Sequence, residues 1–437
     1  MKALLPMTNR PRVLIIGGGY AGIMLAKGLR NSPFQVVMVD RHNYHAFQPL
    51  YYQVATGGLE PDSIAFPLRK MFARQENYVF RIAEVQQIDT ENKTAHTSIG
   101  EISYDYLVIA TGAVTNFFGM KEVEANGMSM KSIPEALDLR SLILQNFEQA
   151  LQEVAEGRDS LMKFVIVGGG PTGVETAGAL AELKRHVLPN DYPELDLRQM
   201  EIHLIESGDR LLGGMSEKSS ADARKALEDL GVHIWLDTRV TGFDGKLITT
   251  AGGEDFYAST LIWAAGIKGA LPEGMPTESV GRGNRLQVDQ YNLVKGHEHI
   301  YAIGDIALMA GGDAKYPNGH PQVAQVAIQM GKTLSKNLIR LHNGAPLEGF
   351  SYQDPGSMAT IGRNKAVADF PQGLHLKGLI AWLAWMFVHL LFLIGGRNKL
   401  VVFVNWVWSY FTYDKGTRLI IRPFKRKKVA EPAAQGV

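Results

Sequence analysis

The chain has 437 residues, of which 46% are hydrophobic and 20% are charged, a balance typical of a folded protein with two or three domains. Lysine and arginine (45) nearly cancel aspartate and glutamate (44), so the overall charge gives no reason to expect a nucleic-acid partner. There is no cysteine, which excludes disulfides, thiolate metal sites, iron–sulfur clusters and thiol-based redox chemistry. Any redox function must therefore use a bound organic cofactor. The amino-terminal stretch has no apolar run long enough for a signal peptide.

The first predicted element is a buried strand at residues 13–16 that runs into three spaced glycines. G-x-G-x-x-G spacing gives a tight turn, lets backbone approach a pyrophosphate and packs a helix close to the strand. A second apolar strand, residues 34–39, ends at Asp40, where an acid would hold a ribose hydroxyl. A plain strand–turn–helix is the alternative, but strand, triplet and acid together predict a dinucleotide site. Its predicted residues are Gly17, Gly19, Tyr20, Ala21, Gly22, Asp40 and Arg41.

The same pattern returns about 150 residues later, after a predicted strand at residues 164–167. Its acid is Glu206, at the end of a strand over residues 201–205, and an acid there favours NADH over NADPH. Arg210 lies nearby and keeps use of NADPH open. The residues predicted to bind this second nucleotide are Gly168, Gly170, Pro171, Thr172, Gly173, Glu206, Ala265 and Gly266.

Three further strand ends support the first site. Residues 104–113 form an apolar strand that runs into Thr111 and Gly112, and residues 261–267 repeat its form. Residues 301–307 put Asp305 at a strand end, where a carboxylate would bind a ribityl or phosphate-linked hydroxyl. Two dinucleotide sites in one chain suit hydride transfer between a permanent flavin and a transient nicotinamide.

With these motifs, residues 10–365 resemble the two-dinucleotide-fold flavoprotein reductases. The resemblance implies that the first glycine motif binds FAD and that the second, nested in the first domain, binds NAD(P)H. Because cysteine is absent, the disulfide reductases, thiol peroxidases and sulfide:quinone reductases of that superfamily are excluded.

Two stretches, residues 41–59 and 320–332, closely resemble the type II NADH dehydrogenases, the single-subunit NADH:quinone oxidoreductases. The second contains Ala324-Gln325-x-Ala327-x-Gln329, the form of that family's quinone motif; an amphipathic helix with solvated glutamines is the alternative. The resemblance implies that Ala324 and Gln325 also lie against the flavin. A quinone needs an apolar slot and a few hydrogen-bond donors. The predicted quinone residues are Gln48, Tyr52, Gln325 and Gln329.

Glu175 lies at the start of the helix after the second glycine motif. The resemblance implies that it sits near nicotinamide and flavin and takes part in proton uptake for the quinone. The alternative is an anion stabilised by the helix N-terminus. Lys377 matches a lysine that lies near the flavin and the quinone in that family. This assignment rests on the resemblance alone. No histidine pair has metal-ligand spacing, so no metal is expected, and a solvated or structural role is predicted for His42, His45 and His320.

The carboxyl-terminal part contains two short apolar runs, residues 379–394 and 400–413, and four of the six tryptophans. Residues 422–428 then add five positive charges, which are expected on anionic lipid headgroups. Three interpretations compete: a core hairpin, a transmembrane segment around 379–394, and two helices lying in the membrane interface. The third is favoured because each run is shorter than a spanning helix and because interfaces attract aromatic rings.

The predicted fold class is α/β, with two Rossmann-like doubly wound domains and a carboxyl-terminal membrane anchor. The predicted order is FAD domain (10–120), NADH domain (121–270), FAD domain again (271–365) and anchor (366–437). The predicted function is transfer of hydride from NADH to FAD and of two electrons to menaquinone or ubiquinone, without ion pumping. The enzyme is expected on the cytoplasmic face of the cell membrane, in contact with lipids, and dimers are common in that family. Two alternatives are a soluble NAD(P)H-flavin reductase with a small acceptor and a flavin-binding NADH sensor.

Overall fold

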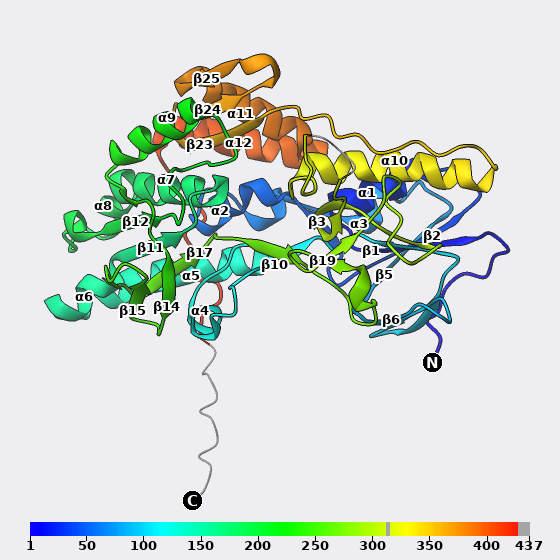
Figure 1. The fold of residues 1–437 in the computed structure, drawn as a ribbon. Helices are drawn as coiled ribbons and strands as arrows, with labels where there is room; N and C mark the ends of the chain where they lie inside the picture. The colour runs from blue at the N-terminus through cyan, green and yellow to red at the C-terminus, as the bar shows by residue number, and fades with distance from the viewer. Residues whose placement is uncertain (312–314, 427–437) are drawn as a thin grey trace, which may run out of the picture. The chain divides into compact units, whose positions relative to one another are not determined.

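The structure is a computed structural model that describes residues 1–311 and 315–426 (Figure 1). The chain divides into two compact units, each built from segments far apart in sequence. The first unit comprises Met1–Ala46, Phe66–Val114 and Ile267–Pro355, and the second comprises Phe47–Ala65, Thr115–Gly266 and the chain from Gly356 onward. The prediction placed residues 47–65 in the FAD domain (10–120) and treated residues 366–437 as a separate anchor. In the structure, residues 47–65 and the carboxyl-terminal segment pack within the second unit.

The first unit contains a five-stranded parallel sheet in the order β21-β9-β1-β2-β5 (Figure 1). Its strands are β21 (Ile300–Ala302), β9 (Tyr106–Ile109), β1 (Arg12–Ile16), β2 (Gln35–Asp40) and β5 (Tyr78–Ile82). The inner strands are covered on both faces, which explains their continuous apolar sequence. This unit also contains an antiparallel sheet of β6 (Val85–Asp89), β7 (Thr94–Thr97) and β8 (Gly100–Ser103). A small mixed sheet is formed by β19 (Val280–Gly281), β20 (Arg285–Gln287) and β22 (Ala307–Leu308).

Helices α1 (Tyr20–Gly28) and α10 (Ala324–His342) pack closely against each other in the first unit. Glycine allows this contact: a Cβ at Gly28 would lie 2.1 Å from Oγ of Ser335, and one at Gly331 would lie 2.4 Å from the carbonyl oxygen of Ala21. The close packing places the start of α10 beside the glycine turn that begins α1.

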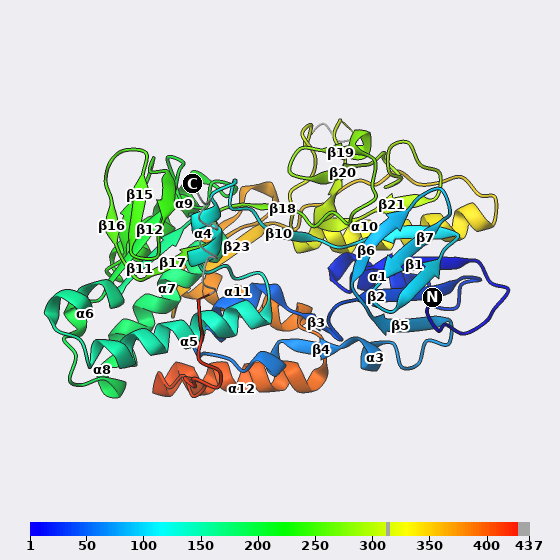
Figure 2. The same cartoon turned by 90° about the horizontal axis from the view of Figure 1, so that it is seen from below.

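The second unit repeats this design with a four-stranded parallel sheet in the order β13-β12-β11-β17 (Figure 2). In both sheets the strand before the glycines lies between the strand that ends at the acid and a strand that ends in an Ala-x-Gly turn. The elements are β13 (His233–Trp235), β12 (Glu201–Ile205), β11 (Lys163–Val167) and β17 (Thr260–Trp263), with α5 (Ile133–Ala150), α7 (Pro171–His186), α9 (Glu217–Glu228) and the antiparallel sheet β14 (Val240–Phe243), β15 (Leu247–Thr250) and β16 (Phe256–Tyr257). The repeated sequence pattern thus corresponds to a repeated fold.

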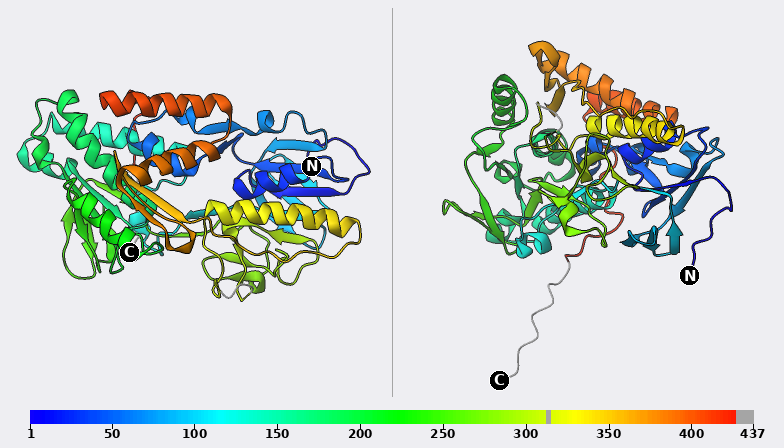
Figure 3. Two further views of the ribbon diagram at one scale, coloured as in Figure 1. Left: turned by 90° about the horizontal axis from the view of Figure 1, so that it is seen from above. Right: turned by 45° about the vertical axis from the view of Figure 1, so that its right-hand side comes forward.

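The carboxyl-terminal segment adds an antiparallel sheet and two helices to the second unit (Figure 3). The first strand of this sheet packs on α7 so closely that a Cβ at Gly178 would lie 1.7 Å from the carbonyl oxygen of Ile361. The elements are β23 (Ser357–Gly362), β24 (Lys365–Asp369), β25 (His375–Lys377), α11 (Gly378–Phe392) and α12 (Gly396–Thr412).

Across the part of the chain that the structure describes, no helix has both the length and the apolarity to cross a membrane. The predicted run at residues 379–394 forms α11, which has 15 residues, whereas crossing takes roughly 20. The transmembrane alternative for this segment is therefore not supported.

Helix α12 buries two asparagine amides against the protein and leaves most of its large apolar side chains exposed. Asn398 donates to the carbonyl oxygens of Asp62 and Ala65, and Asn405 donates to the Glu60 carboxylate at 2.7 Å. The exposed residues of α12 include Leu400, Phe403, Val404, Val407, Trp408 and Phe411, and those of α11 include Ile380, Leu383, Phe387 and Leu391. This is the reverse of the usual pattern for a helix on a protein that faces water.

Residues 413–426, called the strap below, follow α12 along the second unit. Arg418 pairs with Asp191 at 2.6 Å, and Arg422 pairs with Asp138. Arg426 donates to the carbonyl oxygens of Gly245 and Ser259. The expectation that this basic segment lies on lipid headgroups is therefore wrong for Arg426, whose guanidinium binds the protein. For Arg422, whose side chain is 69% exposed, it stays a prediction. Lys427 and Lys428 lie outside the described residues.

Candidate functional site

The glycine turn of the first unit has the geometry of a dinucleotide cradle. Gly17 has φ +109°, and a Cβ there would lie 2.3 Å from the carbonyl oxygen of Ala110. A Cβ at Gly22 would lie 2.0 Å from the carbonyl oxygen of Gly17, so the helix can approach the strand only because both are glycine. Gly19, the N-cap of α1, has open space at its Cβ position. The helix N-terminus is thus accessible to an anionic phosphate.

The acid of this cradle braces the turn. Asp40 accepts the backbone N–H of Gly18 at 2.7 Å and that of His42 at 2.7 Å. A carboxylate has about four lone-pair sites, so Asp40 retains capacity to accept ribose hydroxyls.

The second unit repeats these contacts nearly atom for atom. Gly168 has φ +112°, and its Cβ position lies 2.8 Å from the carbonyl oxygen of Ala264; that of Gly173 lies 1.9 Å from the carbonyl oxygen of Gly168. Glu206 accepts the N–H of Gly169 at 2.6 Å, as Asp40 does for Gly18. The structure therefore brings the predicted NADH residues together at one edge of one sheet, with Pro171 and Thr172 in the first turn of α7 and Ala265 and Gly266 after β17.

Several elements of the first unit converge on its glycine turn, as a flavin site requires. A Cβ at Gly304, next to Asp305, would contact the Cβ atoms of Ala21 and Ala327 at 3.2 and 3.3 Å. The strand end at Thr111 and Gly112, the loop of Asp305 and the start of α10 at Ala324 and Gln325 therefore lie around one turn. Arg41 and Tyr20 flank the same turn, Arg41 with an exposed side chain.

Two buried polar atoms beside this turn fit a bound cofactor. Oγ1 of Thr111 and Nε2 of His45 are buried and have no hydrogen-bond partner among the residues described. The Nδ1 of His45 lies 3.2 Å from the carbonyl oxygen of Gly18, and burial lowers the pKa of His45 to about 4. His45 is therefore a neutral ring that donates to the glycine turn, and its Nε2 is an acceptor that a cofactor hydroxyl could satisfy.

Two predicted residues have other partners. The side chain of Gln329 donates to the carbonyl oxygen of Gln353 at 2.8 Å and accepts its N–H at 2.9 Å. Nζ of Lys377 lies 3.0 Å from Asp222 on α9, and the side chain is 66% exposed. Gln329 thus fixes the loop at Gln353, and Lys377 forms an ion pair at the surface. Neither partner is close in sequence, so neither contact could be read from it.

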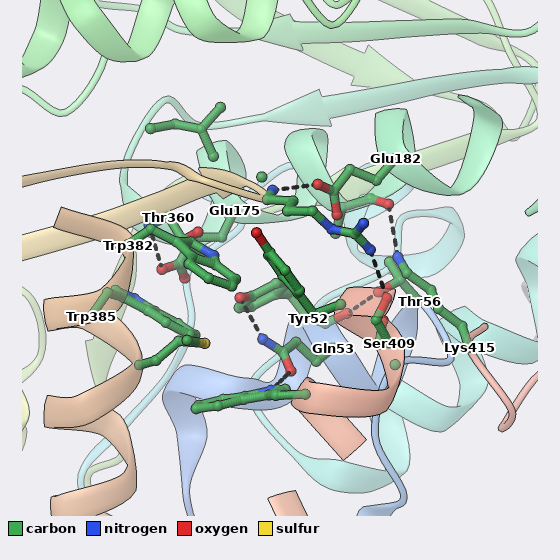
Figure 4. Close-up of a pocket in the computed structure, with 18 residues that line it drawn as sticks. Tyr52, Gln53, Thr56, Glu175, Glu182, Thr360, Trp382, Trp385, Ser409 and Lys415 are labelled. Atoms are coloured by element: carbon green, nitrogen blue, oxygen red, sulfur yellow. Dashed lines mark hydrogen bonds between the residues drawn. The ribbon is translucent and has the colours of Figure 1, made fainter. Parts of the chain in front are cut away.

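The second unit contains a cavity of about 110 Å³ between α2 (Tyr51–Ala55), α7, β23, α11 and α12 (Figure 4). Glu175 is 8% exposed on its wall, and burial raises the pKa of Glu175 to about 8. The N–H of Thr360, at 3.4 Å, and the indole of Trp385 oppose that shift, although Nε1 of Trp385 lies outside hydrogen-bond geometry. Burial therefore favours the neutral form of the Glu175 carboxyl.

Tyr52 lines the same cavity and shares it with a residue that sequence reasoning missed. Gln53 donates to the Tyr52 hydroxyl at 2.8 Å and accepts the indole N–H of Trp406 at 2.8 Å. Burial raises the pKa of Tyr52, so its hydroxyl remains protonated. Gln48, in the short helix Gln48–Leu50 before α2, has an exposed side chain. Only the packing of α12 on α2 identifies Gln53, because no local pattern links it to Trp406.

His42 and His320 lie against aromatic rings. His320 is buried and lies edge-on to Phe350, and His42 stacks on Tyr44 at 5.2 Å. Within residues 1–311 and 315–426, no group of three or more histidine, aspartate or glutamate side chains is placed to hold a metal ion.

Two matched dinucleotide cradles in one chain define the class of flavin-dependent pyridine nucleotide oxidoreductases. The profile of the pyridine nucleotide-disulphide oxidoreductase family matches residues 11–331, and that of the NDH2 C-terminal domain matches residues 355–412. This chain has no cysteine for the chemistry in the first family's name.

Comparison with individual proteins identifies the family within this class. The type II NADH:quinone oxidoreductase NdhA of Mycobacterium tuberculosis is 34% identical over 94% of this chain and 90% of its own length. The type II NADH:quinone oxidoreductase of Haemophilus influenzae is 29% identical over 80% of this chain and 84% of its own. The fold matches NDH2 of Plasmodium falciparum, solved in complex with NADH, with a TM-score of 0.85, 20% identity and coverage of 95% and 100%. The chain belongs to the family of type II NADH:quinone oxidoreductases.

Proposed function

We propose that this chain catalyses the reaction NADH + H⁺ + quinone → NAD⁺ + quinol, with FAD as the resident cofactor. The observation that carries the proposal is the pair of equivalent cradles in a cysteine-free chain, one of them on the helix that carries the buried acid Glu175. Bound FAD supplies the step between two-electron donor and acceptor, because it takes hydride from NADH and passes two electrons onward.

The proposed roles in nucleotide binding follow from the contacts. Gly17, Gly19 and Gly22 open the turn to a pyrophosphate, and Asp40 holds the adenosine ribose of FAD. Gly168, Gly170 and Gly173 serve NADH in the same way. Glu206 would repel a 2′-phosphate, which favours NADH over NADPH, and Arg210 is bonded to the carbonyl oxygen of Gly213.

The proposed quinone roles rest on Tyr52 and Glu175, which lie at the buried end of the cavity in the second unit. Tyr52 offers a neutral hydroxyl and Glu175 a proton to a reduced quinone oxygen. Gln48 and Gln325 stay predicted hydrogen-bond donors to the quinone, whereas the Gln329 amide is largely used by Gln353. Lys377, whose ammonium pairs with Asp222, stays a predicted contact of the flavin.

The proposed location is the cytoplasmic surface of the cell membrane, with α11 and α12 lying in the headgroup region. The support is the reversed pattern of α12, with Phe403, Trp408 and Phe411 51%, 60% and 78% exposed. Side chains of this kind insert shallowly into one leaflet and favour its interface. A quinone dissolved in lipid, menaquinone or ubiquinone, would enter from that side.

The test is NADH oxidation by the FAD-loaded full-length protein with a long-chain quinone embedded in phospholipid vesicles. We expect turnover with the embedded quinone, and little when the vesicles are omitted and a water-soluble dye is the only acceptor. A protein that turns over only the dye would be a soluble flavin reductase, and one reduced by NADH without turnover would be a sensor.

A further inference from the structure

The cavity beside Glu175 continues along α7 to a second carboxylate. Glu175, Ala179 and Glu182 all line it, since positions separated by four and three residues share one helix face. At 1.5 Å per residue, the two acids are separated by ~10 Å along the helix. Figure 4 shows both side chains on the cavity wall.

Burial changes from one end of the cavity to the other. Glu175, Tyr52 and Trp385 are 8%, 6% and 2% exposed. Glu182, which lines the other end, is partly exposed. The cavity therefore connects a buried acid with an acid that reaches solvent.

The cavity has the size and the lining to hold a chain of waters. Its volume of about 110 Å³ exceeds the ~30 Å³ that one water occupies in the liquid, so about three to four waters fit. Nε1 of Trp385 is buried and makes no hydrogen bond with the described residues, so it is a donor available to water. Three waters and two carboxyl groups joined by hydrogen bonds of ~2.8 Å span about 11 Å, close to the separation of the two acids.

Positive groups surround the outer acid. The backbone N–H of Arg363 donates to Oε1 of Glu182, and Nζ of Lys415 donates to the carbonyl oxygen of Ala179 at 3.3 Å. Burial lowers the pKa of Lys415, and the Glu182 charge opposes that shift. His186 on α7 also interacts electrostatically with Glu182, and the Arg363 side chain lines the same cavity. Hydrogen-bond donors and positive charge therefore hold the Glu182 carboxylate at this end of the cavity.

We propose that Glu182 relays solvent protons through this cavity to Glu175 during quinone reduction. The relay rests on the proposed function, in which the hydride and one solvent proton convert quinone to quinol. A proton from bulk water binds Glu182; O–H bonds then break and form in turn along the waters to Glu175. Glu175 passes its proton to a reduced quinone oxygen and is reprotonated, while both electrons come from NADH.

The test compares the two half-reactions of the FAD-loaded full-length protein in vesicles with a long-chain quinone. Glu182→Gln keeps an oxygen for the Arg363 N–H but cannot carry a proton. We expect flavin reduction by NADH at the wild-type rate, and reoxidation by quinone about tenfold slower or more, with a larger solvent deuterium isotope effect. KM for quinone is expected to be unchanged. Glu194→Gln, an exposed acid of the same unit, is the matched control and is expected to behave as wild type.

A second variant tests the waters instead of the acid. Ala179→Leu fills the cavity between Glu175 and Glu182 without changing any charge, and the same selective slowing is expected. Reoxidation at the wild-type rate in Glu182→Gln would overturn the relay, and so would equal slowing of both half-reactions, which indicates a structural role. A wild-type protein whose reduced flavin is never reoxidised by quinone would instead refute the proposed function.

Discussion

Gly17 and Gly168 occupy the same backbone position in the two units, with φ near +110° and a carbonyl oxygen within 3 Å of the missing Cβ. Alanine at either position would be strained by its φ and would clash with backbone. We expect Gly17→Ala to lose FAD, and Gly168→Ala to keep FAD but to be reduced by NADH at least about tenfold more slowly.

Flavin-to-protein absorbance ratios and stopped-flow reduction rates check this pair, and each variant is the control for the other. If Gly168→Ala released FAD while Gly17→Ala kept it, the assignment of the two nucleotides would be reversed.

The buried carboxyl of Glu175 is expected to make the stability of the protein depend on pH. Because burial raises the pKa of Glu175 from 4.5 to about 8, the native state holds a proton that the unfolded state releases between these values. Stability therefore falls as pH rises from 4.5 to 8, by at most about 5 kcal/mol from this group. In Glu175→Gln this contribution is absent, so the variant gains thermal stability relative to wild type as pH rises. Parallel pH profiles of the thermal midpoint for the two proteins would contradict the assignment.

At the residue scale, local spacing was sufficient for the cradles but not for the partners of long side chains. The glycines and acids at 17–40 and 168–206 could be predicted because a strand, a turn and a helix N-terminus are contiguous in sequence. Gln329 and Lys377 could not, because their partners, Gln353 and Asp222, lie 24 and 155 residues away.

The proposal that α12 lies in the membrane headgroup region can be tested by substituting its exposed side chains. The double variant Phe403→Ser/Phe411→Ser removes two exposed apolar side chains without touching the buried amides. Burial of each such side chain contributes about 1.5–3 kcal/mol, so vesicle binding is expected to weaken by at least tenfold. Sedimentation with phospholipid vesicles measures the loss, and Tyr257→Ser, an exposed aromatic on β16, is the matched control. Unchanged sedimentation would remove α12 from the membrane contact.

For the strap, unlike α12, we expect a substitution to lower the stability of the protein and to leave vesicle binding unchanged. Arg426 donates to two carbonyl oxygens and lies over the Phe243 ring at 5.7 Å. Arg426→Met leaves both carbonyls without this donor and is expected to cost about 1–3 kcal/mol of stability. Vesicle binding is expected to stay at the wild-type level. A variant with wild-type thermal stability but weaker vesicle binding would restore the lipid role first predicted for this segment.

At the element scale, apolar runs predicted where α11 and α12 lie but not which way their faces point. Trp385 and Trp406 belong to runs rich in exposed aromatics, yet Trp385 is buried and Trp406 bonds to Gln53. The basic residues after α12 looked like a lipid contact because sequence shows charge but not the acids and carbonyls that meet it. These assignments need the tertiary structure.

For the whole molecule, two copies of one nucleotide-binding design explain the repeated sequence pattern. The absence of cysteine and the spacing of Gly17 and Gly168 already pointed to a flavoprotein reductase. The sequence did not predict that residues 47–65 and the carboxyl-terminal segment belong to the second unit. This assignment depends on packing between segments that are distant in sequence.

The most direct test is an anaerobic absorbance experiment on the purified full-length protein. We predict a flavin spectrum that bleaches on addition of one equivalent of NADH and returns when a long-chain quinone in vesicles is added. A protein that carries no flavin, or whose bleached flavin is not restored by the quinone, would contradict the account.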